Sequence, residues 1–258
     1  MAKEMKTLAK DTAIYGVSSI VGKFLNWLLV PLYTYTLEKQ SDYGIVTNLY
    51  AWTALLLVVL TYGMETGFFR FANKDPENSQ KVYGNTLISV GITSLLFALI
   101  IVLFYQPIAN GLGYANHSEF IWLLGLTVAM DAFASIPFAY LRFVKRPIVF
   151  AGLKLLYVAL NIVLNLFFLI LCPLLMKVSP ETVSWFYNPH YGVGYIFISN
   201  LLATTIQTVI MLKYIFVAKF IVDGQLLKQI FKYSYPLLFL GIAGIANQNL
   251  DKILFPFL

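Results

Sequence analysis

Residues 12–37 read TAIYGVSSIVGKFLNWLLVPLYTYTL, and this stretch decides the fold. It is mostly apolar and longer than the ~20 residues that an α-helix needs to cross ~30 Å of hydrocarbon. Its one charged residue, Lys23, lies near the middle. The stretch therefore predicts a membrane-spanning helix that carries a cation.

Similar apolar stretches follow along the whole chain. Apolar residue types make up 59% of the 258 residues and charged types only 12%, whereas about 25% of the residues in soluble domains are charged. We therefore expect an all-α integral membrane protein with six spans and a seventh stretch that reaches the last residue. The stretches are 12–37, 44–66, 84–106, 119–141, 149–173, 193–218 and 235–258.

The basic residues are unevenly distributed between the loops. Most lie in the N-terminal segment and in the loops after the second, fourth and sixth stretches, whereas the alternate loops hold only Lys39 and Lys177. Because loops rich in Lys and Arg stay on the cytoplasmic side, we expect a multi-pass protein with a cytoplasmic N-terminus. The net charge of +6 then reflects contact with anionic lipid headgroups rather than with nucleic acid.

Polar residues inside the apolar stretches predict a substrate cavity. A charge near the middle of a bilayer helix costs about 2.5–3.5 kcal/mol on insertion scales, so it needs a partner, water or a substrate. Helical spacing places these charges and several amides on one face of each helix, and we expect the faces to meet. The predicted cavity residues are Lys23, Asn26, Asp131, Lys154, Asn161 and Gln207.

The amides and Lys154 also have a purely structural interpretation. The amides could equally form interhelical hydrogen bonds, which contribute about 0.6 kcal/mol on average. Lys154 lies only a few residues into its span, so its side chain could reach the cytoplasmic interface instead. Glu65 and Arg70 could form an interfacial ion pair or a gate between helices, and we favour the ion pair.

Residues for catalysis or metal binding do not form a recognisable pattern. The only histidines, His117 and His190, fall in predicted loops, and no hydrolase, nucleotide-binding or zinc-protease motif is present in the sequence. Asp251 is the sole candidate partner for Asp131 in an intramembrane aspartate pair, and nothing couples the two. The sequence therefore predicts neither an enzyme nor a bound metal or cofactor.

Three segments carry a family resemblance. They are PLYTYTLEKQSDYGIVTNLY (31–50), YGMETGFFRF (62–71) and YSYPLLFLGIAGIANQNLDKILFPFL (233–258). They resemble bacterial polysaccharide-biosynthesis membrane proteins, the lipid-linked oligosaccharide flippases of the multidrug/oligosaccharidyl-lipid/polysaccharide exporter (MOP) superfamily. The resemblance covers the chain but only the first half of a typical two-lobed, MATE-type member. It implies that residues 1–232 form the N-terminal six-helix lobe and that 233–258 begin the second lobe of a longer chain.

The resemblance also implies a function. A flippase would move an undecaprenyl-pyrophosphate-linked oligosaccharide across a bacterial cytoplasmic membrane by alternating access, for surface polysaccharides such as O-antigen lipopolysaccharide. Lys23 and Lys154 would bind the pyrophosphate, the amides would bind sugar hydroxyls, and Asp131 or Asp251 could couple transport to a proton or sodium gradient. Its partners would be the lipid-linked glycan, membrane lipids and the glycan polymerase machinery.

Two alternatives stay open at this point. A cation-coupled multidrug antiporter of the same superfamily would use acidic cavity residues, and Asp131 and Glu65 keep this alternative alive. A membrane-embedded glycan polymerase or acyltransferase would need a large catalytic loop or an intramembrane histidine. In either transporter, Pro31, Pro137, Pro173 and Pro236 offer points at which helices could bend.

Overall fold

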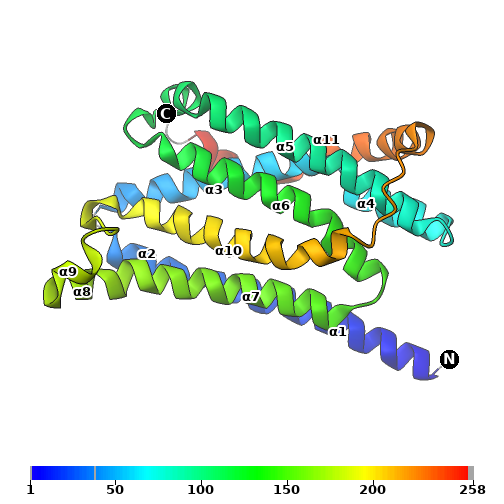
Figure 1. The fold of residues 1–258 in the computed structure, drawn as a ribbon, viewed down its shortest axis with the longest axis horizontal. Coiled ribbons are helices and arrows are strands. Elements are labelled where there is room, and N and C mark those ends of the chain that lie inside the picture. Colours follow the sequence, from blue (N-terminus) through cyan, green and yellow to red (C-terminus); the bar gives the residue numbers. More distant parts are fainter. Residues whose placement is uncertain (1, 38, 255–258) are drawn as a thin grey trace. The chain divides into compact units, whose positions relative to one another are not determined.

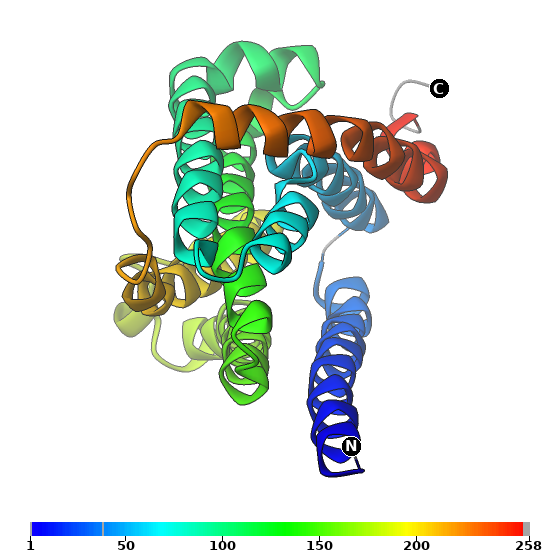
Figure 2. The same cartoon turned by 90° about the vertical axis from the view of Figure 1, so that its right-hand side faces the viewer.

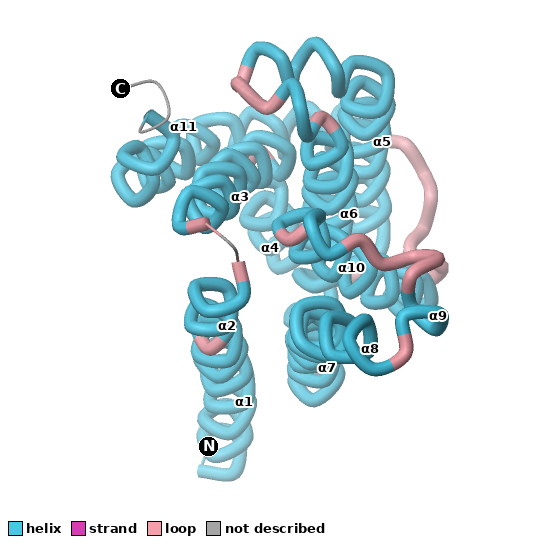
Figure 3. The backbone as a smooth tube through the Cα atoms, turned by 90° about the vertical axis from the view of Figure 1, so that its left-hand side faces the viewer, coloured by secondary structure: helices cyan, strands magenta, loops and turns pink. Residues whose placement is uncertain are grey.

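The structure is a computed structural model that describes residues 2–37 and 39–254, with side chains from residue 12 onward except at 26 and 40. All regular elements in this part are helical (Figures 1 and 3). They are α1 (Ala2–Trp27), α2 (Leu29–Thr36), α3 (Gln40–Thr61), α4 (Met64–Lys74), α5 (Ser79–Gly111), η1 (Ala115–His117), α6 (Glu119–Phe143), α7 (Pro147–Leu166), η2 (Phe167–Leu171), α8 (Cys172–Val178), α9 (Pro180–Val183), η3 (Pro189–Tyr191), α10 (Val193–Ile215) and α11 (Gly224–Leu254).

Six segments of the described chain are long and apolar enough to cross a membrane. They are Thr12–Thr36, Ser41–Lys74, Ser79–Gly111, Glu119–Phe143, Pro147–Val178 and Val193–Ile215. The prediction of an all-α integral membrane protein is confirmed. The seventh predicted stretch falls in α11, which is not among these six, and its residues 255–258 lie outside the described range.

Two spans are interrupted. In the first, between α1 and α2, Leu28 keeps right-handed helical dihedrals (φ −63°, ψ −18°), and the hydrogen-bond pattern is interrupted because Pro31 has no N–H to donate to the carbonyl four residues earlier. The second was predicted as one stretch but breaks between α3 and α4, where Tyr62 has a φ of 32° and Gly63 a φ of 73°. A left-handed conformation costs glycine little, so Gly63 favours this break.

Near two further prolines the helix departs from α-helical geometry, whereas two others lie inside helices that continue past them. α5 departs from helical geometry at Phe104 (φ −120°, ψ 16°), near Pro107, which follows the predicted apolar stretch 84–106. The fifth span turns π-helical over Phe167–Leu171, just before Pro173. Pro137 and Pro236 lie inside α6 and α11, and each helix continues through its proline.

The chain divides into two compact units, and the boundaries fall within α3, between α6 and α7, and within α10. The first unit is Met1–Val46 with Lys145–Gln207, and the second is Thr47–Val144 with Thr208–Leu258. In the first unit α1 packs against α7. In the second, α4, α5 and α6 pack together and α11 lies across α4 and α5 (Figure 2). The hydrophobic core of the second unit contains Met64, Phe68, Val82, Tyr83, Leu87, Val90, Ile136, Ala139 and Ile230.

Candidate functional site

Lys23 lies on an exposed face of α1. On another face of this helix, the ring of Tyr15 meets Phe150 of α7 at a centroid distance of 5.1 Å. Lys23 itself is exposed, and so are its neighbours Ile20 and Phe24. A charged ammonium therefore emerges from a mostly apolar helix surface. Asn26 lies in α1, but its side chain is outside the described residues.

Amides connect α7 with α10 in the first unit. The Nε2 atom of Gln207 donates to the backbone carbonyl of Leu153 at 2.9 Å, and the hydroxyl of Tyr157 donates to Oδ1 of Asn200 at 2.6 Å. Gln207 is buried. Its nitrogen therefore forms an interhelical hydrogen bond of the kind that stabilises membrane helix pairs.

Two further amides are buried one turn apart on α7. The Nδ2 atom of Asn165 donates to the backbone carbonyl of Asn161 at 2.7 Å and to Oδ1 of Asn161 at 3.1 Å. Asn165 is fully buried, and its Oδ1 has no hydrogen-bond partner among the described atoms. A buried acceptor without a partner costs free energy, and a buried water molecule bound to this oxygen would offset that cost.

The charged residues predicted for the cavity are divided between the two units. Lys154 is half-buried on α7, in the same unit as Lys23, Asn161 and Gln207. Asp131 is half-buried on α6 of the second unit, and Asp251 is exposed near the end of α11. The first unit thus contains both lysines predicted for the cavity, Lys23 and Lys154, and all three predicted amides.

The expected pair of Glu65 with Arg70 is wrong. Glu65 forms an ion pair with Arg142 at the end of α6, and the guanidinium of Arg70 lies over the ring of Tyr233, 4.2 Å from its centroid. Glu65 and Arg70 are five residues apart on α4, so at about 100° per residue their side chains point in different directions. The carboxylate instead meets a cation 77 residues away.

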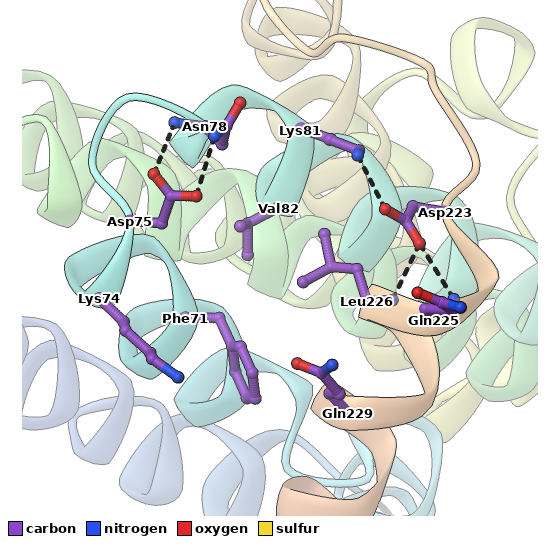
Figure 4. A pocket seen from close by; sticks show the side chains of 10 residues that line it. All are labelled: Phe71, Lys74, Asp75, Asn78, Lys81, Val82, Asp223, Gln225, Leu226 and Gln229. Carbon is purple, nitrogen blue, oxygen red and sulfur yellow. Dashed lines mark hydrogen bonds and ion pairs between the residues drawn. The ribbon is translucent and has the colours of Figure 1, made fainter.

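A polar pocket of about 520 Å³ lies at the junction of α4, α5 and α11 (Figure 4). The ammonium of Lys81 contacts a carboxylate oxygen of Asp223 at 2.7 Å. The other oxygen accepts from the backbone N–H groups of Gln225 and Leu226 at 3.0 Å each. The Leu226 N–H and Lys81 lower the pKa of Asp223 below its ordinary value. Lys74, Asn78 and Gln229 also line the pocket.

The loop before α11 is fixed to α5 beside this pocket. Asn85, which is buried, donates to the carbonyl of Ile221 at 2.8 Å and accepts from the N–H of Asp223 at 2.8 Å. A Cβ on Gly84 would lie 2.1 Å from the carbonyl oxygen of Lys219. Sequence reasoning missed this contact, although glycine and asparagine at the start of an apolar stretch were a signal.

Gly67 allows α4 and α11 to approach closely. A Cβ on Gly67 would lie 2.4 Å from Oγ of Ser234, and one on Gly63 would lie 2.8 Å from the Ser234 carbonyl oxygen. Gly63, which precedes α4 in the left-handed conformation, and Gly67 within α4 form a G-x-x-x-G pattern, and small residues at this spacing allow close approach. The pattern was present in the sequence and was overlooked.

The fold and these polar residues define a multi-pass helical membrane protein with charged and amide side chains inside its spans. Within the described residues no three His, Cys, Asp or Glu side chains are close enough to hold a metal ion. The sequence matches the family described as polysaccharide biosynthesis protein over residues 8–258. The chain belongs to this family. Neither the curated proteins nor the solved structures contained a significant match.

Proposed function

We propose that this protein is a flippase that moves an anionic, undecaprenyl-pyrophosphate-linked oligosaccharide across a cytoplasmic membrane by alternating access. The family supports a role in polysaccharide biosynthesis, and six candidate spans support a membrane transporter. The observation that carries the proposal is Lys23, whose ammonium is exposed inside the first of these spans.

The chemistry of the substrate explains this lysine. An ammonium facing only lipid at this depth would be unfavourable by about 2.5–3.5 kcal/mol. A pyrophosphate offers several anionic oxygens, and hydrogen bonds between ionised groups are about twice as strong as neutral ones. Lys154 would supply a second cation on α7.

The direction of transport follows from the proposed orientation. We place the N-terminus, Arg142 and the polar pocket around Lys81 on the cytoplasmic side, because basic loops remain there. In this orientation the glycan would enter from the cytoplasm and leave on the far side, where a glycan polymerase could use it.

A cation-coupled antiporter is the second candidate, and Asp131 favours it. This carboxylate is half-buried in the middle of α6, and a proton or sodium ion could bind there. A membrane-embedded polymerase or acyltransferase has less support. The histidines that could serve such an enzyme, His117 and His190, are exposed in η1 and η3, outside the candidate spans.

A reconstitution experiment separates these functions. Vesicles would contain the purified protein and the undecaprenyl-pyrophosphate-linked glycan isolated from the cells that make it, and an impermeant glycosidase would be added outside. A flippase makes the inner-leaflet glycan accessible, so digestion proceeds beyond the outer-leaflet share. Digestion that stops at this share, together with gradient-driven uptake of ethidium by the same vesicles, would support the antiporter instead.

A further inference from the structure

A second pocket, of about 330 Å³, lies in the second unit between α3, α5 and α6. Its lining is apolar and includes Trp52 and Leu56 of α3, Phe97 and Ile101 of α5, and Leu124 and Val128 of α6. The hydroxyl of Thr53, also in the lining, donates to the carbonyl of Tyr50 on its own helix at 2.8 Å. The pocket thus offers a hydrocarbon surface inside three candidate membrane spans.

The bend in α5 lies within the segment that lines this pocket. Ile101 precedes the non-helical residue Phe104, and Ile108 follows it. On the opposite wall, a Cβ on Gly125 would lie only 2.5 Å from Cγ2 of Ile101. The helices α5 and α6 are therefore in direct contact at Gly125, whereas the pocket lies beside the bend in α5.

Polar groups lie next to one end of the pocket. Leu49 and Leu112 are lining residues, and their near neighbours Asn48 and Tyr114 are joined by a 2.9 Å hydrogen bond from the tyrosine hydroxyl. Nδ2 of Asn48 donates in turn to the backbone carbonyl of Lys252 at 2.6 Å. Tyrosine is typical of the membrane–water interface. The pocket therefore has a polar end at the loop after α5 and an apolar interior.

An apolar cavity stays dry and takes up apolar ligands; a cavity of about 150 Å³ holds benzene. A pocket of 330 Å³ has room for a segment of a hydrocarbon chain. Its described lining contains no charged side chain that would select a pyrophosphate, and bilayer phospholipid is the hydrocarbon in greatest excess around these spans. We propose that the pocket binds one acyl chain of a phospholipid, with the lipid headgroup beside Tyr114.

The fluorescence of Trp52 tests this proposal directly. In a variant with Phe at positions 27, 122 and 185, Trp52 is the only tryptophan, and vesicles of phosphatidylcholine with dibrominated acyl chains quench a tryptophan on contact. We expect Trp52 to be quenched. A second variant that keeps only Trp122, which does not line the pocket, reports general contact with lipid. Unquenched Trp52 in folded protein would overturn the proposal.

A pocket-filling substitution separates the bound chain from the surrounding lipid. Thr53→Phe places a ring in the pocket, and Ile108→Phe serves if that variant does not fold. We expect the filled variant to lose Trp52 quenching and to keep Trp122 quenching. Ile92→Phe, on an exposed part of α5 away from the pocket, is the matched control and should keep both. Equal Trp52 quenching in the filled and control variants would contradict a bound chain.

Mass spectrometry of the protein released from detergent identifies the lipid. We expect an adduct with the mass of a phospholipid in the unsubstituted protein and its loss in Thr53→Phe. An adduct with the mass of a polyprenyl phosphate, lost in the same variant, would show that the pocket holds an isoprenoid chain and would overturn the choice of phospholipid. Because both measurements are independent of transport, they stand or fall separately from the proposed flippase activity.

Discussion

Lys23 is the residue at which charge and apolar surroundings conflict most clearly. If its ammonium binds a pyrophosphate, Lys23→Arg should keep part of glycan export, because the charge remains while its geometry changes. Lys23→Gln should weaken headgroup binding at least about tenfold, since a hydrogen bond to a charged group contributes about 1.5–3 kcal/mol. Lys23→Glu should be worst because it repels the substrate. Export by cells with equal amounts of each variant measures this order.

Asp131 provides the control for Lys23. If Lys23 only neutralised this carboxylate, Lys23→Gln would leave one buried ion unpaired, and adding Asp131→Asn would restore export. We expect no restoration. Recovery in the double variant would assign Lys23 a structural role, and normal export in Lys23→Gln alone would exclude both roles.

Protonation of the Asp223 carboxylate should lower the stability of the folded protein at acidic pH. Its pKa in the folded protein lies below the ordinary value of 3.8, mainly because the Leu226 N–H and Lys81 favour the carboxylate. The stabilisation is therefore complete above about pH 4 and lost as the pH falls through the folded-state pKa. In the Asp223→Asn variant the unfolding temperature should fall less at acidic pH, because the amide does not titrate. The amide oxygen still accepts a hydrogen bond at the helix terminus. Unfolding temperatures between pH 3 and 7 measure it, and parallel curves for the two proteins would contradict it.

At the scale of helices, Gly67 sets the distance between α4 and α11. Gly67→Ala should destabilise the protein by about 1–3 kcal/mol, the usual cost of overpacking, because the new Cβ would meet Oγ of Ser234 at 2.4 Å and Cγ2 of Ile230 at 2.9 Å. Thermal unfolding in detergent, followed by circular dichroism, measures the loss.

Two further variants test whether this contact is the cause. Ser234→Gly removes the hydroxymethyl group, so the double variant should be more stable than the sum of the single effects predicts. Gly152→Ala on α7 is the matched control, since nothing lies within 4 Å of its Cβ position. Alanine favours helix over glycine by up to about 1 kcal/mol, so Gly152→Ala should not destabilise. Additive effects of Gly67→Ala and Ser234→Gly would argue against the contact.

The existence of the helices could be predicted from the sequence, whereas their breaks could be predicted only in part. Apolar length is a local property, so six stretches gave six spans. Pro31 also acts locally, on the carbonyl four residues earlier. The break at Gly63 adjoins a contact with Ser234, which is distant in the sequence. Pro107 was a local signal, but α5 continues past the end of its apolar stretch and includes it.

For the whole molecule, the sequence indicated which polar residues lie within spans but not which groups they meet. The depth of Lys23 and the burial of Asn161 follow from position along a helix. The pairing of Glu65 with Arg142 and the hydrogen bond from Gln207 to Leu153 need the packing of helices that are distant in the sequence. The pocket at Asp223 was missed for the same reason, because residues 71–82 and 223–229, which are distant in the sequence, form it together.

Membrane orientation is the property of the whole molecule on which the direction of export depends. We expect an N-terminus in the cytoplasm, because the basic residues gather in the loops on that side. In a Cys172→Ser background, single cysteines at the exposed positions Asn116 and Glu181 should react with an impermeant maleimide on intact cells. A cysteine at the exposed Glu77 should react only after the membrane is permeabilised. The reverse pattern would place the pocket around Lys81 outside the cell, and the proposed transport would then run inward.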